Sequence, residues 1–216
     1  MKSTLLAFLF LAAVCQVIGQ SNKFTAGLEY SPNFTNTTLP SPFYSGHDGG
    51  YRFAQSIFLK GGYRLIDNLY VTGAVGYFTT REYITFNWGD EVGIDRITSE
   101  RFHAYVATPV GLTYYMGSFF VSPEIAIGWN TGNCFKDHFY FSDRSQQENS
   151  GKDEENLYNV NKTTYPVFLS FGNEIKMKNC SVLLGVKGYY SLNLIGTAPS
   201  NTSHYYGIGL ITGVKF

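Results

Sequence analysis

The chain has 216 residues, which is enough for one domain or two small ones. Its 16 basic and 16 acidic residues balance, so nothing indicates a nucleic-acid partner. Charged residues make up only 15% of the chain, whereas aromatic residues reach 17% and glycines number 23, a balance that favours β structure over helical packing.

The N-terminus has the features of a secretory signal peptide. A basic residue precedes the apolar residues 5–14, and Gly19 supplies a small residue at a cleavage point. The apolar stretch is too short for a membrane-spanning helix. A lipoprotein signal ending before Cys15 is the weaker alternative, because the residue before that cysteine is a valine rather than a small residue. We therefore predict that residues 1–19 are a signal peptide and that residues 20–216 form one exported domain.

Apolar residues then alternate with small or polar residues in eight segments, which is the pattern of a β-strand with one apolar face. The predicted strands are, in chain order, residues 23–31, 51–65, 69–88, 97–115, 119–129, 163–177, 181–192 and 205–216.

The connections between these segments alternate in length. Those after the second, fourth and sixth strands are about three residues long, whereas the others are long and polar, and we expect the longest, Asn130–Asn161, to be irregular. A membrane barrel with both termini in the periplasm has short inner turns and long outer loops in this order. The sequence thus predicts an all-β fold, an eight-stranded antiparallel up-and-down transmembrane β-barrel.

The last strand, Tyr205–Phe216, carries the alternation most clearly. Every second residue counted back from Phe216 is apolar, aromatic or methyl-bearing, and the other face is mostly small or polar. We expect the apolar face to meet lipid and the terminal strand to be recognised by the barrel-assembly machinery. Aromatic residues at the strand ends suit an interfacial girdle. The residues that we predict to face lipid include Phe102, Val106, Ile125, Leu169 and Leu210.

The opposite faces carry ionisable residues, which we expect inside the barrel. Eight strands enclose an interior just wide enough for side chains, and an unpaired buried charge is costly. We predict a structural network of ion pairs in the lumen, with a gated polar path or a catalytic cluster as the alternatives. Its members are Glu29, Arg52, Lys60, Arg64, Arg101, His103, Glu124, Glu174 and Lys187.

Enzymatic chemistry is weakly indicated. His103 with Arg101, Glu124 and a serine such as Ser122 could form a hydrolase or acyltransferase site. However, no Gly-x-Ser-x-Gly motif occurs, and the other histidines lie in or beside different predicted loops. No spacing of His, Cys, Asp and Glu matches a metal site. We predict that the protein is not an enzyme and holds no metal or cofactor.

Two cysteines fall at opposite ends of the predicted barrel. Cys134 lies in the predicted outer loop and Cys180 beside a short inner turn. A membrane barrel has an apolar band about 25 Å tall, and a disulfide needs Cα atoms within about 7 Å. We therefore predict no intramolecular disulfide.

Five segments resemble strand motifs of the PorT-like outer-membrane β-barrel family. They are His103–Tyr115, Phe119–Trp129, Phe171–Glu174, Gly188–Leu192 and Gly213–Phe216. The chain departs from the family at Ala107, where a glutamate is common, and at Val214, where a tyrosine is. The resemblance implies an eight-stranded barrel in the outer membrane of a Gram-negative cell. Because members of the family mostly have no established activity, it assigns no functional residue.

Together these features predict a monomeric, non-enzymatic outer-membrane protein. Its outer loops would serve surface interaction or envelope integrity, or its lumen would allow limited passage of small solutes. The alternative is a soluble exported barrel that binds a hydrophobic ligand, as lipocalins do, which would need the apolar faces inside. An outer-membrane acyltransferase or hydrolase is the least favoured reading.

Overall fold

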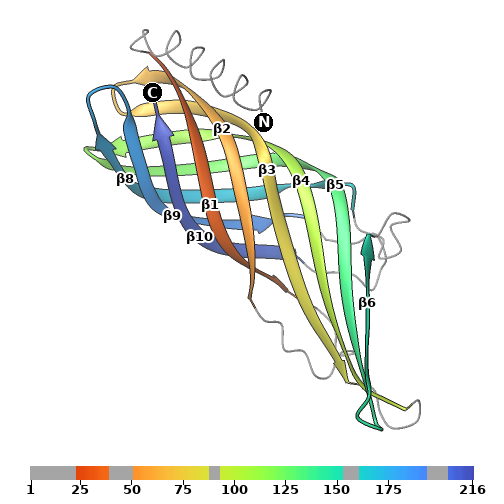
Figure 1. Cartoon of the computed structure of the whole chain (residues 1–216). Coiled ribbons are helices and arrows are strands. Elements are labelled where there is room, and N and C mark those ends of the chain that lie inside the picture. The colour runs from red at the N-terminus through yellow and green to blue at the C-terminus, as the bar shows by residue number, and fades with distance from the viewer. Residues whose placement is uncertain (1–22, 39–50, 88–92, 153–160, 194–203) are drawn as a thin grey trace, which may run out of the picture.

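A computed structural model describes residues 23–38, 51–87, 93–152, 161–193 and 204–216 (Figure 1). The predicted signal peptide, residues 1–19, lies outside the described residues. Among those residues no helix is long and apolar enough to cross a membrane. The ten described strands are β1 (Phe24–Thr38), β2 (Arg52–Ile66), β3 (Leu69–Asn87), β4 (Ile94–Met116), β5 (Phe119–Phe141), β6 (Gln146–Lys152), β7 (Thr163–Thr164), β8 (Pro166–Lys176), β9 (Ser181–Ser191) and β10 (His204–Lys215).

Eight of these strands close into a barrel. Each of β1, β2, β3, β4, β5, β8, β9 and β10 pairs antiparallel with the next in this order, and β10 returns to pair with β1 through contacts such as Leu28 with Val214. The short two-residue strand β7 pairs with β5 just ahead of β8. The predicted eight-stranded, antiparallel, up-and-down barrel is therefore confirmed.

The predicted short turns lie at one end of the barrel, where the chain also ends. β2 passes into β3 between Ile66 and Leu69, and β4 into β5 between Met116 and Phe119. The backbone of Phe216 exchanges hydrogen bonds of 2.7 and 3.2 Å with Ala26 near this end. Figure 1 shows the C-terminus beside these turns and the turn between β5 and β6 at the far end.

The prediction of an irregular segment over Asn130–Asn161 was wrong for residues 130–152, which form the end of β5, a turn and β6. β5 continues to Phe141, and β6 pairs with it. A β-bulge explains why the sequence pattern breaks: Asn130 pairs with Tyr105 and Gly132 with Ala104, so that Thr131 is an extra residue. One extra residue exchanges the two faces of a strand.

The turn that joins β5 to β6 has a defined conformation that hydrogen bonds stabilise. Arg144 adopts a left-handed conformation with φ of 69°, and the amide N–H of Phe141 donates to the carbonyl of Ser145 at 3.0 Å. The side chain and the backbone N–H of Ser145 both hydrogen-bond the Asp143 carboxylate and lower the pKa of Asp143. These contacts fold residues 142–145 back so that β6 can pair.

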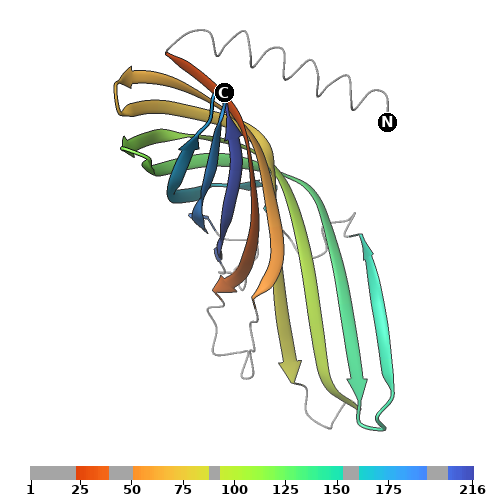
Figure 2. The same cartoon turned by 60° about the vertical axis from the view of Figure 1, so that its left-hand side comes forward.

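Beyond the barrel, β3, β4 and β5 continue and β6 joins them; we call this extension of the same sheet the outer sheet. The β2–β3 ladder ends at Ser56 and Phe78, whereas the β3–β4 ladder runs on to Asn87 and Arg96. The outer sheet comprises residues 81–87 of β3, 94–102 of β4, 134–141 of β5 and all of β6. In two views it projects away from the end of the barrel that carries the short turns (Figures 1 and 2).

Candidate functional site

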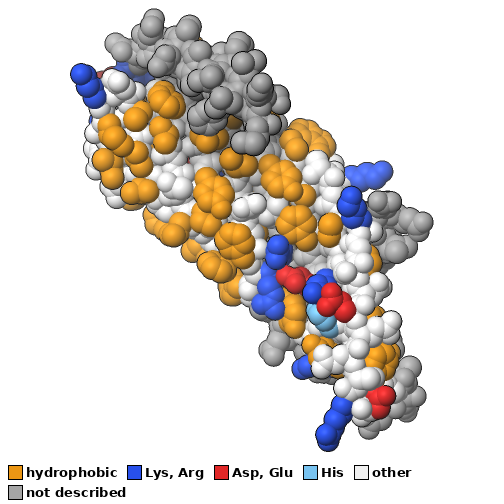
Figure 3. Space-filling view, viewed as in Figure 1, with side chains coloured by type: hydrophobic (Ala, Val, Ile, Leu, Met, Phe, Trp, Pro, Cys, Tyr) orange, Lys and Arg blue, Asp and Glu red, His pale blue; other side chains and the backbone are white. Residues whose placement is uncertain are grey.

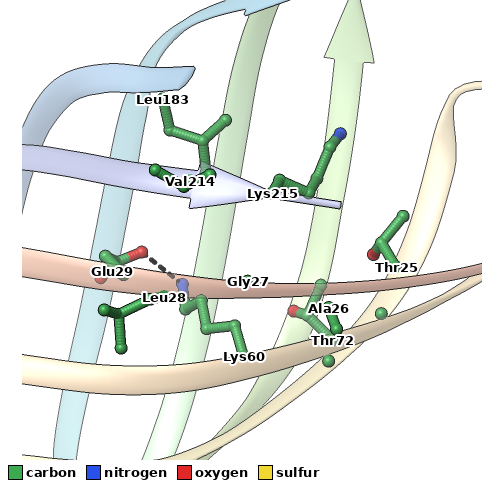
Figure 4. A pocket seen from close by; sticks show the side chains of 12 residues that line it. Thr25, Ala26, Gly27, Leu28, Glu29, Lys60, Thr72, Leu183, Val214 and Lys215 are labelled. Carbon is green, nitrogen blue, oxygen red and sulfur yellow. Dashed lines mark ion pairs between the residues drawn. The ribbon is translucent and has the colours of Figure 1, made fainter. Parts of the chain in front are cut away.

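A network of four charged side chains spans the lumen. We call Glu29, Lys60, Glu124 and Lys187 the lumen quartet; they come from β1, β2, β5 and β9. Lys60 Nζ lies 2.8 Å from Glu29 and 2.7 Å from Glu124, and Lys187 Nζ lies 2.6 Å from Glu29 and 4.0 Å from Glu124. Two positive charges face two negative ones, so the buried network carries no net charge. Figure 4 shows one of these contacts, the ion pair between Lys60 and Glu29.

A small cavity separates the quartet from a second ion pair nearer the short turns. It measures about 40 Å³ and lies beside Lys60, Thr72 and Lys215. Lys215 Nζ binds Glu174 Oε2 at 2.7 Å and Tyr115 Oη at 3.1 Å. Figure 4 shows Lys60 and Lys215 approaching this space from different strands. A cavity of this size holds about one or two water molecules and no organic ligand.

Packed rings fill the lumen on the other side of the quartet. The aromatic plug consists of Phe58, Phe78, Tyr105, Phe168, Tyr189 and Tyr205, all buried. Phe78 stacks on Tyr105 with ring centres 5.0 Å apart, and Phe58 meets Phe168 edge-on at 5.8 Å. Lys187 Nζ lies 4.6 Å from the ring centres of both Phe58 and Phe168, so the quartet and the plug are in direct contact. The lumen is a packed core at this level.

A third polar group lies beyond the plug, toward the outer sheet. Arg101 Nη1 is 3.4 Å from Glu82 Oε1, and His103 Nε2 is 3.7 Å from the same oxygen. His103 Nδ1 lies 2.8 Å from Asn133 Oδ1, which also accepts a 2.8 Å hydrogen bond from Asn130. Because that amide oxygen can only accept, Nδ1 carries the proton.

The nine predicted lumen residues thus fall into three groups, with two residues outside them. The quartet holds four, Glu174 pairs with Lys215, and Arg101 and His103 share Glu82. Arg52 instead places its guanidinium 4.0 Å from the ring centre of Tyr83. Arg64, beside a short turn, makes no ion pair with any described residue.

Sequence reasoning missed Glu82 as a member of the lumen. It lies in the polar and aromatic stretch of β3, where the apolar alternation has already faded. The register pairs Glu82 with Arg101, a basic residue that was in the predicted network. A search for opposite charges on neighbouring strands could have found the pair.

His103 and Ser122, the residues of the alternative catalytic site, do not lie together. Ser122 Oγ lies 2.7 Å from Thr113 Oγ1 and donates to Glu124 at 3.5 Å, whereas His103 contacts Glu82 and Asn133 in a different layer. The part of the chain that the structure describes contains no group of His, Cys, Asp and Glu that could hold a metal ion.

The outer surface of the barrel is apolar. Val106, Ile125, Leu169 and Leu210 point outward and are exposed, as are aromatic residues toward both ends of the strands. One aromatic row, toward the short turns, includes Phe24, Tyr63, Tyr114 and Phe216; the other includes Phe53, Trp129, Tyr165 and Tyr190. Figure 3 shows apolar side chains over the barrel and charged ones gathered on the outer sheet.

The outward face of the outer sheet is different in kind. Arg81 pairs with Glu100 at 3.4 Å, and its guanidinium lies 5.3 Å from the ring centre of Phe102. Lys136 pairs with Glu148 at 3.0 Å. Phe102 therefore packs among charged groups, outside the apolar surface for which the sequence suggested it. Exposed ion pairs of this kind belong in water.

The two cysteines of the described chain lie in these different regions. Cys134 is exposed on β5 in the outer sheet, and Cys180 is half-buried beside the short turn between β8 and β9; both are free thiols.

Neither a protein-family model nor a curated protein matches the sequence. Solved structures similar to this chain include the attachment invasion locus protein Ail of Yersinia pestis, with 10% identity, a TM-score of 0.41 and coverage of 90% of this chain and 99% of that one. Neisserial surface protein A has 13% identity, a TM-score of 0.40 and coverage of 89% and 97%. The outer membrane protease OmpT of Escherichia coli has 12% identity, a TM-score of 0.43 and coverage of 90% and 96%. These are distant likenesses.

Proposed function

We propose that this protein is a non-enzymatic β-barrel of the outer membrane of a Gram-negative cell, and that it presents its outer sheet to the surroundings for surface interaction. The observation that carries the proposal is the distribution of side chains: the barrel is apolar outside and charged inside. A water-soluble carrier needs the reverse arrangement, with a ligand cavity in place of the aromatic plug. Lipid around the barrel accounts for both faces.

The two ends of the barrel give the proposed orientation. Outer-membrane barrels have short periplasmic turns and longer extracellular connections. The turns at Ile66–Leu69 and Met116–Phe119 would then lie in the periplasm, and the outer sheet would stand outside the cell. The ion pairs on that sheet support its contact with water. The resemblance of five segments to PorT-like strands agrees with this location and remains a prediction.

The native cysteines test this orientation. A membrane-impermeant maleimide added to intact cells is expected to label Cys134 and to leave Cys180 unlabelled until the outer membrane is permeabilised. The variants Cys134→Ser and Cys180→Ser serve as matched controls, because each retains one of the two sites. Labelling of Cys180 in intact cells would reverse the orientation, and soluble protein in the periplasm would contradict the membrane assignment.

The filled lumen favours surface interaction over solute passage. The quartet and the plug occupy successive layers of the interior, and the cavity between the quartet and the Lys215–Glu174 ion pair is only about 40 Å³. Protein reconstituted in planar bilayers is therefore expected to give no stepwise conductance above that of protein-free bilayers. A general porin measured in the same bilayers is the positive control. Steady conductance steps would instead support passage of small solutes through the lumen.

A further inference from the structure

The outer sheet ends in a strand whose second edge has no described partner. Within the described ranges β6 pairs with β5 alone, and all seven of its residues are exposed. The hydrogen bond from Phe141 to Ser145 fixes the pattern of the ladder, since bonded and non-bonded residue pairs alternate in an antiparallel sheet. The residues whose backbone N–H and C=O groups consequently point to the free edge are Gln146, Glu148, Ser150 and Lys152.

The charges along this edge are complementary to those of an antiparallel copy. In a pairing centred on Ser150, Glu148 of each copy lies directly opposite Lys152 of the other, on the same face of the sheet. This register joins residues that all offer backbone groups to the free edge, as hydrogen-bonded pairing requires. Glu148 already contacts Lys136 at 3.0 Å, whereas Lys152 has no ion pair with a described residue. Opposite charges at facing positions stabilise a ladder.

Charged side chains on an edge strand usually prevent pairing with other proteins. Here the same charges would repel most strands and accept a strand that carries Lys152 and Glu148 at matching positions. Specificity of this kind comes from excluding the wrong partners as well as from attracting the right one. A second copy of this chain meets the requirement.

Antiparallel pairing also determines how the two barrels are oriented. The two-fold axis that relates antiparallel neighbours is perpendicular to the sheet, so the paired strands run in opposite directions. Because the outer sheet projects from one end of the barrel in both views (Figures 1 and 2), the second barrel would lie beyond the far end of the sheet. Two barrels arranged in this way cannot share one membrane with the same orientation, but they can face each other from two membranes.

We propose that β6 pairs with β6 of a second copy embedded in a facing membrane, and so joins the two membranes. The proposal rests on the function proposed above, because it names the partner of the outer sheet. Contact requires no ligand and no other protein. It depends on two symmetry-related Glu148–Lys152 pairs and on the backbone groups of three residues, Glu148, Ser150 and Lys152, that point away from β5.

Vesicle tethering tests the proposal. Phosphatidylcholine vesicles carrying the purified protein are expected to cluster, as measured by light scattering, and protein-free vesicles are not. Lys152→Glu should lower the clustering rate by about tenfold, since it turns two attractive pairs into repulsive ones. Arg144→Glu is the matched control, because that residue lies in the exposed turn and outside the ladder, and it should cluster like the wild type.

A variant in which the two charges are exchanged distinguishes specific self-pairing from nonspecific clustering of vesicles. Vesicles with the double variant Glu148→Lys, Lys152→Glu should cluster with one another again. They should fail to cluster with wild-type vesicles, because like charges would then face each other at both positions. Clustering of the mixed populations, or full clustering of Lys152→Glu, would overturn the proposal.

Cross-linking tests the register. In a background of Cys134→Ser and Cys180→Ser, Ser150→Cys should form an intermolecular disulfide on mild oxidation, because paired Cα atoms at this position lie about 5.5 Å apart. Gln146→Cys, on the same edge, should not, because the two copies of residue 146 lie far from each other in this register. If vesicles do not cluster although Cys134 is labelled on intact cells, the pairing is refuted and the surface location stands. If Cys134 is not labelled, both proposals fail.

Discussion

Replacing Lys187 with methionine is expected to lower the free energy of unfolding by about 3–5 kcal/mol. The Lys187 side chain is 1% exposed and lies 2.6 Å from Glu29. Without it, the single ammonium of Lys60 must balance the carboxylates of Glu29 and Glu124, so a negative charge stays buried in the lumen. Methionine keeps much of the packing against Phe58 and Phe168. The measurement is urea unfolding in detergent micelles, followed by tryptophan fluorescence.

The balance of charge, rather than the number of ion pairs, should decide this loss. Adding Glu29→Gln to Lys187→Met leaves Lys60 paired with Glu124 at 2.7 Å and makes the interior neutral again. Most of the lost stability should return. Lys136→Met, which removes an exposed ion pair on the outer sheet, should cost less than about 1 kcal/mol. If the double variant is less stable than Lys187→Met alone, charge balance is not the controlling factor.

Leu210→Arg is expected to cost about 2–4 kcal/mol when the protein folds into phospholipid vesicles from urea. Leu210 is 65% exposed on the outer face of β10, between the two aromatic rows. An arginine there would lie near the middle of the bilayer. Ile66 is 64% exposed but lies beside a short turn, so Ile66→Arg should cost only about 0–1 kcal/mol.

The comparison of these two variants separates lipid from water as the solvent of the barrel. The two positions have nearly equal exposure, so a barrel surrounded by water should tolerate both changes equally. A depth-dependent cost arises only in a membrane. Equal and small costs would therefore contradict the proposed location and revive the soluble carrier.

The sequence predicts the barrel well because its strands separate two different environments. On β10, from Tyr206 to Val214, exposed side chains that are mostly apolar alternate with buried ones that face the crowded lumen. The outer sheet lacks this contrast, since both of its faces carry polar and aromatic residues. The bulge at Thr131 also shifts the phase of β5. The extension of β5 and the pairing of β6 could not be predicted for these reasons.

The partners inside the lumen depend on the closed shape rather than on local pattern. Lys187 and Glu29 are 158 positions apart in the sequence and lie on β9 and β1, which β10 separates. Their contact follows from the curvature of the barrel and the register of three strands. Alternation could place both residues on the inner face, but it could not show which acid meets which base. Glu82 was missed because its segment has no such alternation.

The position of the quartet along the chain has a consequence for how the barrel is built. Glu29 belongs to the first strand and Lys187 to the last but one. An assembly intermediate that lacks β9 holds Glu29, Lys60 and Glu124 with one excess negative charge. The interior becomes neutral only when β9 is added and brings Lys187. The electrostatic interactions that stabilise the finished barrel therefore also favour closing the barrel over leaving it open.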